Sequence, residues 1–293
     1  MRALTVLFIF FCVFFLACQK EPDSKGGGTN PPVTPEDTSA LGKFIKATGI
    51  TDATLKSNLD SLINKARRHG WWDICDVIYP MAGGTSTSCK FNLKDPRDSD
   101  SAFRLTFKGA TWTFSSGSAN PGDSGYGSTH FNPAVHIADP NSCHLSIYST
   151  SNISGDDDNA DIGAYDLATN SGFYLSARTN WPDTSGKPYA AIGGNGLQGD
   201  VMNGAGYLMV SKTSATEGSF YRDGSVMNSY FTSPGSLPNL DLFICNQNFS
   251  GASEPYNMGF SKRGLSFVTI GSGIDSTMAA SMYADINDFV NRK

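Results

Sequence analysis

Oxygen ligands concentrate in one short stretch of this chain, the sequence SGDDDNADIG at residues 154–163. Five side chains there carry donor oxygens: Asp156, Asp157, Asp158, Asn159 and Asp161. Calcium takes roughly six to eight such hard ligands, which a turn rich in carboxylates can supply. The spacing does not follow the D-x-D-x-D-G pattern of an EF-hand, and acidic turns are usually only solvated. We therefore predict that the protein requires no cofactor, with calcium at this turn as the alternative.

Aromatic, amide and carboxylate side chains share three other polar segments. They are Tyr126 in GDSGYGST, Trp181 and Asp183 in RTNWPDTSGK, and Asn195 in GGNGLQG. Loops on a rigid scaffold are where ligand contacts concentrate. A ring can stack on the apolar face of a sugar while neighbouring polar groups bond its hydroxyls, so we predict that these four residues contact a ligand. The alternative for Trp181 is that it caps the core.

Hydrolysis of a glycosidic bond requires a pair of carboxylates, one protonated and one ionised. The chain has four glutamates, and none shares a strand-like segment with another: Glu21, Glu36, Glu217 and Glu254. We therefore predict no catalytic residues and favour binding without catalysis.

Three histidines lie within 15 residues of one another: His130, His136 and His144. Their spacings fit no ligand pair on one strand, although His136 and His144 could meet across a hairpin. Surface or packing roles are expected for all three.

Four cysteines lie beyond residue 18: Cys75, Cys89, Cys143 and Cys245. None belongs to a CxxC pair, so a zinc site is not expected. Cys75 and Cys89 flank a turn-rich segment and are the candidate disulfide if the chain is exported. Cys143 and Cys245 lie in apolar, strand-like segments, where small buried thiols are expected.

The first 17 residues have the pattern of an export signal, with Arg2 before an apolar run and Ala17 at its end. Cys18 follows directly and resembles the lipidated cysteine of the bacterial lipoprotein lipobox, although Phe15 stands where that family prefers Leu. The charged residues 19–23 resemble the tag of Bacteroidetes lipoproteins that face the cell exterior. Residues 18–38 are then a lipidated cysteine and a flexible tether, rich in Gly, Pro, Ser and Thr. The resemblance implies a protein anchored by lipid to the outer membrane and exposed outside the cell.

The remaining chain divides into two patterns. Residues 39–84 form a helical lead in which Leu55, Leu59 and Leu62 share one helical face, with Thr51 as a plausible N-cap. Short aromatic and β-branched runs fill most of residues 85–293, separated by turn residues, and this pattern is typical of a β-sandwich. The sequence after residue 274 returns to a helix. The formal net charge is −5 without a basic stripe, so nucleic acid is not an expected partner.

Three segments carry a more specific resemblance: FYRDGSV at 220–226, NLKDPRDSDSAFRLTF at 92–107, and residues 264–290. The first resembles the hairpin of LamG-type, concanavalin A-like jelly rolls, because an aromatic strand meets an Asp-Gly turn. The other two resemble poorly characterised proteins of phages and Bacteroidetes. The resemblance implies a mainly β jelly-roll sandwich with a short N-terminal helical segment and a closing C-terminal helix. It covers the chain from about residue 40 onward.

Such folds host several functions, so the fold alone does not select one. The first hypothesis is a surface lipoprotein whose non-catalytic sandwich binds a glycan or another cell-surface ligand. The alternatives are a prophage-derived structural or protein-interaction module and a divergent glycanase.

Overall fold

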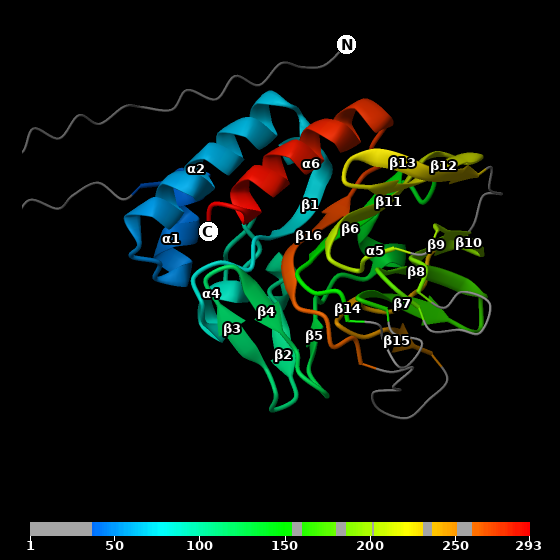
Figure 1. Ribbon diagram of the computed structural model, residues 1–293, viewed down its shortest axis with the longest axis horizontal. Helices are drawn as coiled ribbons and strands as arrows, with labels where there is room; N and C mark the ends of the chain where they lie inside the picture. The colour runs from blue at the N-terminus through cyan, green and yellow to red at the C-terminus, as the bar shows by residue number, and fades with distance from the viewer. Residues whose placement is uncertain (1–36, 154–159, 180–185, 201, 231–235, 251–259) are drawn as a thin grey trace, which may run out of the picture. The chain divides into compact units, whose positions relative to one another are not determined.

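The computed structural model describes residues 37–153, 160–179, 186–200, 202–230, 236–250 and 260–293. Residues Asp37–Lys293 form one compact unit. Two β-sheets, here called sheet A and sheet B, pack face to face, and a layer of helices covers the other face of sheet A (Figure 1). The prediction of a mainly β sandwich with a short N-terminal helical segment and a C-terminal helix is therefore confirmed.

Sheet A has eight strands, seven of them in the order β13-β12-β11-β6-β16-β4-β3, and β1 also pairs with β16. All of its pairings are antiparallel. Its strands are β1 (Cys75–Tyr79), β3 (Thr113–Ser115), β4 (Ser118–Asn120), β6 (Cys143–Ser149), β11 (Gly206–Ser214), β12 (Glu217–Arg222), β13 (Ser225–Tyr230) and β16 (Leu265–Gly271).

In the described residues sheet B has eight strands, seven of them in the order β10-β9-β8-β7-β14-β5-β2, and β15 pairs in parallel with β7. Its strands are β2 (Thr106–Lys108), β5 (Tyr126–Ser128), β7 (Ile162–Asp166), β8 (Ser171–Ser176), β9 (Tyr189–Gly193), β10 (Asn195–Gln198), β14 (Phe243–Ile244) and β15 (Asn248–Phe249).

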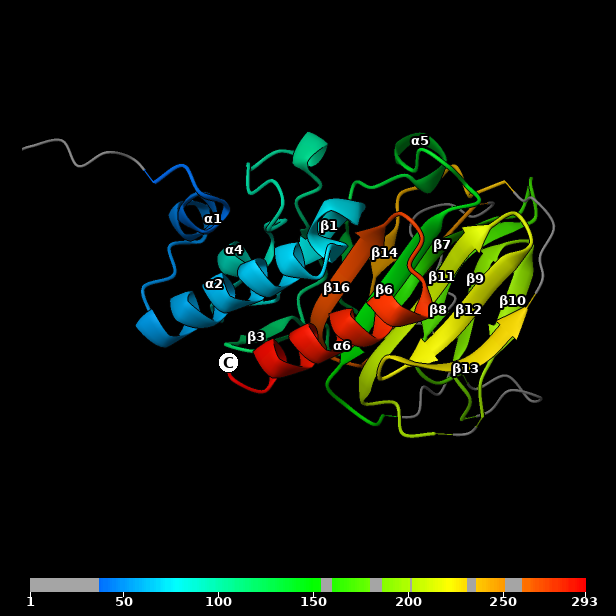
Figure 2. The same cartoon turned by 90° about the horizontal axis from the view of Figure 1, so that it is seen from above.

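Helices α2 and α6 lie side by side over sheet A (Figure 2). In the described part of the chain, none of the helices combines the length and the apolar character needed to cross a membrane. The helices are α1 (Ala40–Thr48), α2 (Ala53–Arg68), α3 (Trp71–Ile74), α4 (Ser86–Cys89), α5 (Pro133–His136) and α6 (Ser276–Val290), with a 3-10 helix, η1, at Asp100–Ala102.

Alternation along the strands of sheet A gives the sandwich two apolar clusters. In β11, Leu208 and Val210 face sheet B, whereas Tyr207 and Met209 face the helices. Successive side chains of a strand point to opposite faces, so a strand buried on both sides is apolar throughout. Phe289 and its neighbours on α6 complete the second cluster, as the apolar face of that helix predicts. The central strands of sheet A are therefore buried on both faces, whereas sheet B, within the described residues, has an outward face that no helix covers.

Helix α2 and the hairpin of β12 and β13 match their sequence signals closely. Helix α2 ends at Arg68, and Gly70 adopts a left-handed conformation just beyond it. Asp223 and Gly224, at φ values of 49° and 76°, join β12 to β13. The N-cap of α2 differs from the expectation, because the Asp52 carboxylate, not Thr51, accepts the Leu55 N–H at 2.6 Å.

Two predictions for residues 75–89 are wrong. Residues Cys75–Tyr79 form strand β1 on the edge of β16 and do not continue the helical lead. Cys75 and Cys89 are free thiols and form no disulfide. They lie in different apolar clusters, Cys75 on the helix side of sheet A and Cys89 between the sheets. Cys143 and Cys245 are buried free thiols, as expected.

His144 lies on β6, fully buried within sheet A. Its Nδ1 is 2.6 Å from the carbonyl oxygen of Ser272 and its Nε2 is 2.9 Å from Oγ1 of Thr269. The carbonyl can only accept, so the imidazole donates through Nδ1 and accepts the Thr269 hydroxyl at Nε2. Burial lowers the pKa of His144 to about 4. The packing role expected for this histidine is confirmed, and His136, on α5, does not share its hydrogen-bond network.

This pKa predicts acid sensitivity. An unfolded histidine titrates near pH 6.5, so the unfolded chain takes up a proton as the pH falls below about 6.5, whereas folded His144 stays neutral down to about 4. Its contribution to stability is complete above about pH 6.5 and is lost between there and about pH 4, a change of about 3 kcal/mol. Chemical denaturation of wild type and His144→Gln across this range should show a shallower loss in the variant. His136→Gln is the control for removal of an exposed imidazole, and parallel pH profiles for wild type and His144→Gln would contradict the assignment.

Candidate functional site

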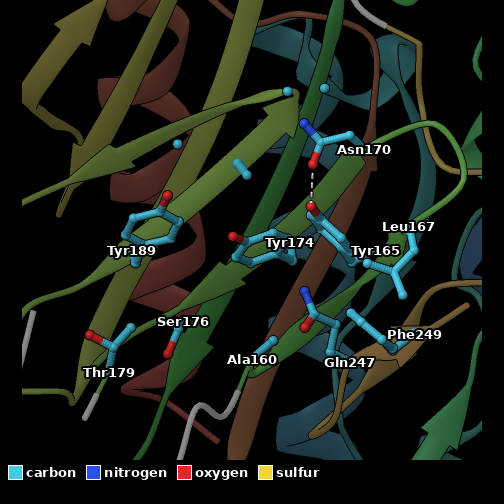
Figure 3. Close-up of a pocket in the computed structure, with 14 residues that line it drawn as sticks. Ala160, Tyr165, Leu167, Asn170, Tyr174, Ser176, Thr179, Tyr189, Gln247 and Phe249 are labelled. Carbon is cyan, nitrogen blue, oxygen red and sulfur yellow. Dashed lines mark hydrogen bonds between the residues drawn. The ribbon is translucent and has the colours of Figure 1, made fainter. Parts of the chain in front are cut away.

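The outward face of sheet B carries a cavity of about 400 Å³. Its walls come from β7, β8, β9, β10 and β15 and from the turns beside them (Figure 3). The lining residues are Ala160, Tyr165, Leu167, Asn170, Tyr174, Ser176, Thr179, Tyr189, Ala191, Gly193, Gly194, Gly196, Gln247 and Phe249.

Two aromatic pairs line this cavity. The rings of Tyr174 and Tyr189 are stacked, with centroids 5.9 Å apart and an interplanar angle of 15°. Tyr165 stacks on Phe249 at 5.6 Å and 9°, and Tyr165 meets Tyr174 edge to face at 6.4 Å. The four rings are partly buried, so each combines a fixed position with an accessible surface.

The strand register places small residues beside these tyrosines. Tyr165 on β7 is opposite Gly172 on β8, and a Cβ at Gly172 would come within 2.7 Å of Cε1 of Tyr174. A Cβ at Gly196 on β10 would overlap the hydroxyl of Tyr189. The rings therefore occupy space that larger neighbours would fill.

The polar groups that line the described part of the cavity are uncharged. The Tyr165 hydroxyl donates to Oδ1 of Asn170 at 2.5 Å. Burial, followed by the proximity of Tyr189 and its hydrogen bond, raises the pKa of Tyr174 well above its usual value, so this phenol stays neutral. No Asp, Glu, Lys, Arg or His is among the described residues that line the cavity.

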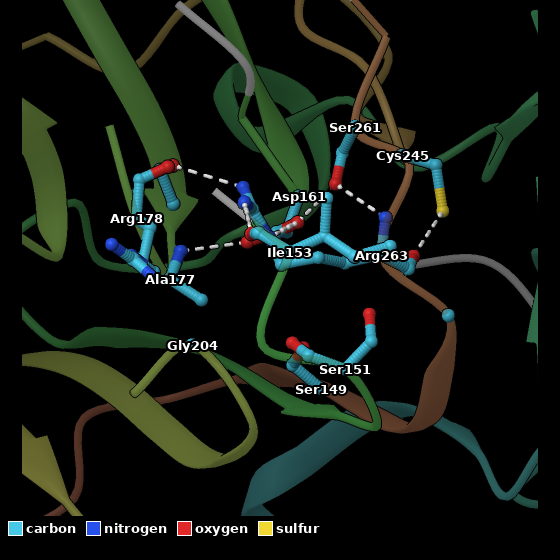
Figure 4. Close-up of polar contacts among 12 residues, drawn as sticks. Ser149, Ser151, Ile153, Asp161, Ala177, Arg178, Gly204, Cys245, Ser261 and Arg263 are labelled. Carbon is cyan, nitrogen blue, oxygen red and sulfur yellow. Dashed lines mark hydrogen bonds and ion pairs between the residues drawn. The ribbon is translucent and has the colours of Figure 1, made fainter. Parts of the chain in front are cut away.

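One carboxylate in the interior fixes the ends of the strands that carry these residues (Figure 4). Asp161, directly before β7, is fully buried, and its Oδ1 accepts Nε of Arg263 at 2.8 Å and the hydroxyl of Ser261. Its Oδ2 accepts the N–H of Ala177, one residue after β8, at 2.6 Å. The carbonyl of Asp161 accepts the N–H of Cys245 at 2.6 Å. Asp161 therefore joins β7, β8, the segment before β16 and the connection from β14 to β15.

Both carboxylate oxygens of Asp161 bond protein groups, which gives this residue a structural role whether or not calcium binds nearby. No group of three or more potential metal ligands occurs among the described residues. Asp156, Asp157, Asp158 and Asn159 lie outside the described residues, so calcium binding by this part of the turn stays a prediction.

The structure describes two of the four predicted ligand-contacting residues, and they lie on different strands of sheet B. Tyr126 lies on β5, where its ring tilts against Phe243 at 4.9 Å, and it does not line the cavity. Asn195 is part of β10, between two glycines that do line it. Trp181 and Asp183 lie outside the described residues, in the segment that follows Thr179 of the cavity wall.

His130 and His136 do not line the cavity. His130 Nε2 is 2.8 Å from Oγ1 of Thr106, and Nδ1 of His136 accepts the N–H of Asn132 at 2.9 Å. Among the described glutamates, Glu217 lies exposed on β12 of sheet A, away from the cavity.

The tyrosines of the cavity and Gln247 were missed at the sequence level. The signal for the tyrosines was present, since Tyr165, Tyr174 and Tyr189 each alternate with buried apolar residues of the same strand and therefore face the other side. No comparable signal marks Gln247, because its position depends on how β14 and β15 join the edge of β7.

Comparison with known proteins identifies the fold but not a family. No protein-family model and no curated protein sequence matches the chain. Among solved structures, domain 4 of AbnA, a GH43 extracellular arabinanase from Geobacillus stearothermophilus in complex with arabinotriose, superposes with a TM-score of 0.50 at 10% identity, covering 71% of this chain and 98% of that one. A mutant Trypanosoma rangeli sialidase with trans-sialidase activity gives 0.51 at 11% identity, covering 79% of this chain but only 39% of the sialidase. These similarities establish a shared sandwich architecture.

The position of Asp161 predicts a large loss of stability when its carboxylate is removed. Asp161→Ala removes the carboxylate that pairs with Arg263, which is 1% exposed, and breaking a buried pair in this way costs about 3–5 kcal/mol. Urea denaturation should detect this loss, and Arg263→Met in the same chain should recover much of it. Asp123→Ala, which removes an exposed partner of Lys262, is the control and should change little. A single variant as stable as wild type would show that the pair does not hold the strand ends.

Proposed function

We propose that residues 37–293 form a non-catalytic domain that binds a glycan, displayed outside the cell by a lipid on Cys18. The observation that carries the proposal is the cavity on the outward face of sheet B, with two stacked aromatic pairs and uncharged polar groups beside them. Ligand pockets are typically concave and mostly apolar, with a few placed polar groups, and this cavity has that composition.

The aromatic surface suits a saccharide for a physical reason. A pyranose or furanose ring presents C–H groups on its faces and hydroxyls around its rim. The phenyl faces of Tyr174 and Tyr189 can cover the C–H groups, while the Tyr165 hydroxyl and Asn170 lie at the polar margin. Because the rings are already packed against one another and against the sheet, little side-chain entropy is lost on binding.

The similar structures support the saccharide class without establishing it. Domain 4 of the arabinanase is described in complex with arabinotriose. The absence of carboxylates and imidazoles from the described lining supports binding without cleavage, since glycoside hydrolysis requires two carboxyl groups beside the scissile bond. Trp181 and Asp183 remain proposed contacts, because they follow Thr179 in the chain.

A lipid anchor on Cys18 would hold the domain at the cell surface. The apolar run that ends at Ala17 and Cys18, followed by a tether rich in Gly and Pro, supports a lipid-held domain at the outer membrane surface. A tether of this composition behaves as a flexible chain that would let the domain sample ligands near the membrane.

Removal of one ring should weaken glycan binding while removal of its hydroxyl should not. Tyr189→Ala is expected to reduce binding to the polysaccharides that the wild type retains by at least about tenfold, or about 1.4 kcal/mol. Tyr189→Phe keeps the stacking surface and should stay close to wild type. Affinity electrophoresis through gels that contain single polysaccharides measures both variants, and circular dichroism checks that they are folded.

The proposal is rejected if the wild type binds no polysaccharide in the panel, or if Tyr189→Ala binds as tightly as wild type. Shortening of a bound polysaccharide during a long incubation, detected as new reducing ends, would contradict the non-catalytic part alone. Exposed Val226→Ala, on β13 of sheet A, is the control for loss of an apolar side chain outside the cavity.

The anchoring proposal has a separate test. Cys18→Ala removes the acceptor sulfur, so the protein should leave the membrane fraction or accumulate with its leader attached. Ser24→Ala, in the tether, is the control and should partition as wild type does. Mass spectrometry that finds no lipid on wild-type Cys18, together with unchanged partitioning of the variant, would refute the assignment.

A further inference from the structure

Gln247 differs from the other polar residues of the cavity in the hydrogen bonding of its side chain. It is 7% exposed, and its amide points into the cavity beneath the rings of Tyr165 and Tyr174 (Figure 3). Its backbone N–H donates to Oδ1 of Asn246 at 2.7 Å, but within the described part of the chain no group hydrogen-bonds its side-chain amide. The amide is therefore open to the cavity.

The backbone around Gln247 is held firmly. Cys245 adopts a left-handed conformation at φ 58°, and this bend lets β14 and β15 lie against the same edge of β7. The N–H of Cys245 donates to the carbonyl of Asp161 at 2.6 Å, and the N–H of Ser261 donates to the carbonyl of Cys245 at 3.0 Å. Gln247 thus projects from a connection that is fixed on both sides.

An amide in such a place can recognise a ligand. The Gln247 amide atoms are not among the fully buried side-chain atoms without a partner, so in the free protein they are open to the cavity, and a ligand that fills it must provide the hydrogen bonds that the amide otherwise loses. A side-chain amide has one accepting oxygen and two N–H donors, which matches two neighbouring hydroxyls, each able to donate and accept.

The residues that line the cavity also indicate which ligand charge it can accept. The described lining offers no cation to pair with a carboxylate or sulfate, and an unpaired charge carried into a partly buried site loses hydration that nothing replaces. The formal net charge of −5 adds a general repulsion of polyanions.

We propose that the cavity selects uncharged glycans and that Gln247 is the residue that recognises their hydroxyl groups. This inference rests on the proposed function and adds the ligand class and the residue that sets it. It distinguishes neutral polysaccharides from polymers of uronic or sialic acids, whose rings could stack equally well.

The test uses the protein purified in detergent and two sets of polysaccharides. Arabinan, galactan, mannan and xyloglucan are the neutral probes, and polygalacturonate, hyaluronate and polysialic acid are the anionic ones. Gel retardation is expected with at least one neutral probe, with an affinity that changes little between low and high salt, because no ion pair is formed.

Gln247→Met preserves the length of the side chain and removes its polar groups. It should weaken binding to the retained neutral probe by at least about tenfold. The melting temperature should stay close to that of wild type, because the side chain makes no hydrogen bond within the described part of the chain. Asn64→Ala, which removes an exposed amide on α2, is the control and should bind as wild type.

The outcomes separate the two proposals. Retention by anionic probes alone, or Gln247→Met binding as tightly as wild type, overturns this inference and leaves glycan binding standing. A lowered melting temperature with unchanged binding would assign Gln247 to the fold and would also overturn it. Retention by no probe overturns both proposals.

Discussion

The buried ion pair between Asp161 and Arg263 joins parts of the chain that no local interaction holds together. Arg263 lies two residues before β16, in sheet A, and Asp161 lies directly before β7, in sheet B. Both side chains are almost completely removed from water, so each charge depends on the other and on the hydrogen bonds around it. The carboxylate also binds the N–H of Ala177, and its backbone carbonyl positions Cys245. One interaction thereby aligns the two sheets and fixes the connection that carries Gln247.

The helical layer determines which face of the sandwich can bind a ligand. Helices α2 and α6 cover sheet A, whose outward residues Tyr207 and Phe267 are fully buried beneath them. The inner faces of both sheets form the main core. The outward face of sheet B is the remaining broad surface, and its aromatic residues stay accessible because small residues stand beside them. Core and site therefore use opposite faces of the same strands.

The chemistry of the cavity is set as much by its uncharged lining as by its rings. Aromatic faces alone do not select one sugar, since many sugars present an apolar side. Selectivity requires polar groups whose hydrogen bonds are not made when the wrong ligand binds. The Gln247 amide, which has no hydrogen bond within the described part of the chain, is such a group. Tyr165 differs in this respect, because its hydroxyl already donates to Asn170 and is therefore held in one orientation.

The sequence alone determined the features that depend on neighbouring residues. Short aromatic and β-branched runs predicted most strands, Asp223 and Gly224 predicted the hairpin turn, and the apolar face of residues 276–290 predicted a docked C-terminal helix. It did not determine that residues 75–79 form an edge strand, because their pairing partner, β16, lies about 190 residues away in the chain. Nor did it separate Asp161 from the acidic residues before it, which are the same type of side chain in the same turn. Only the tertiary structure placed Asp161 against Arg263, and only strand register brought Tyr165, Tyr174 and Tyr189 onto one face beside Gln247. These contacts join residues that are distant in the chain, and local propensity cannot encode them because both partners must first be positioned by the fold.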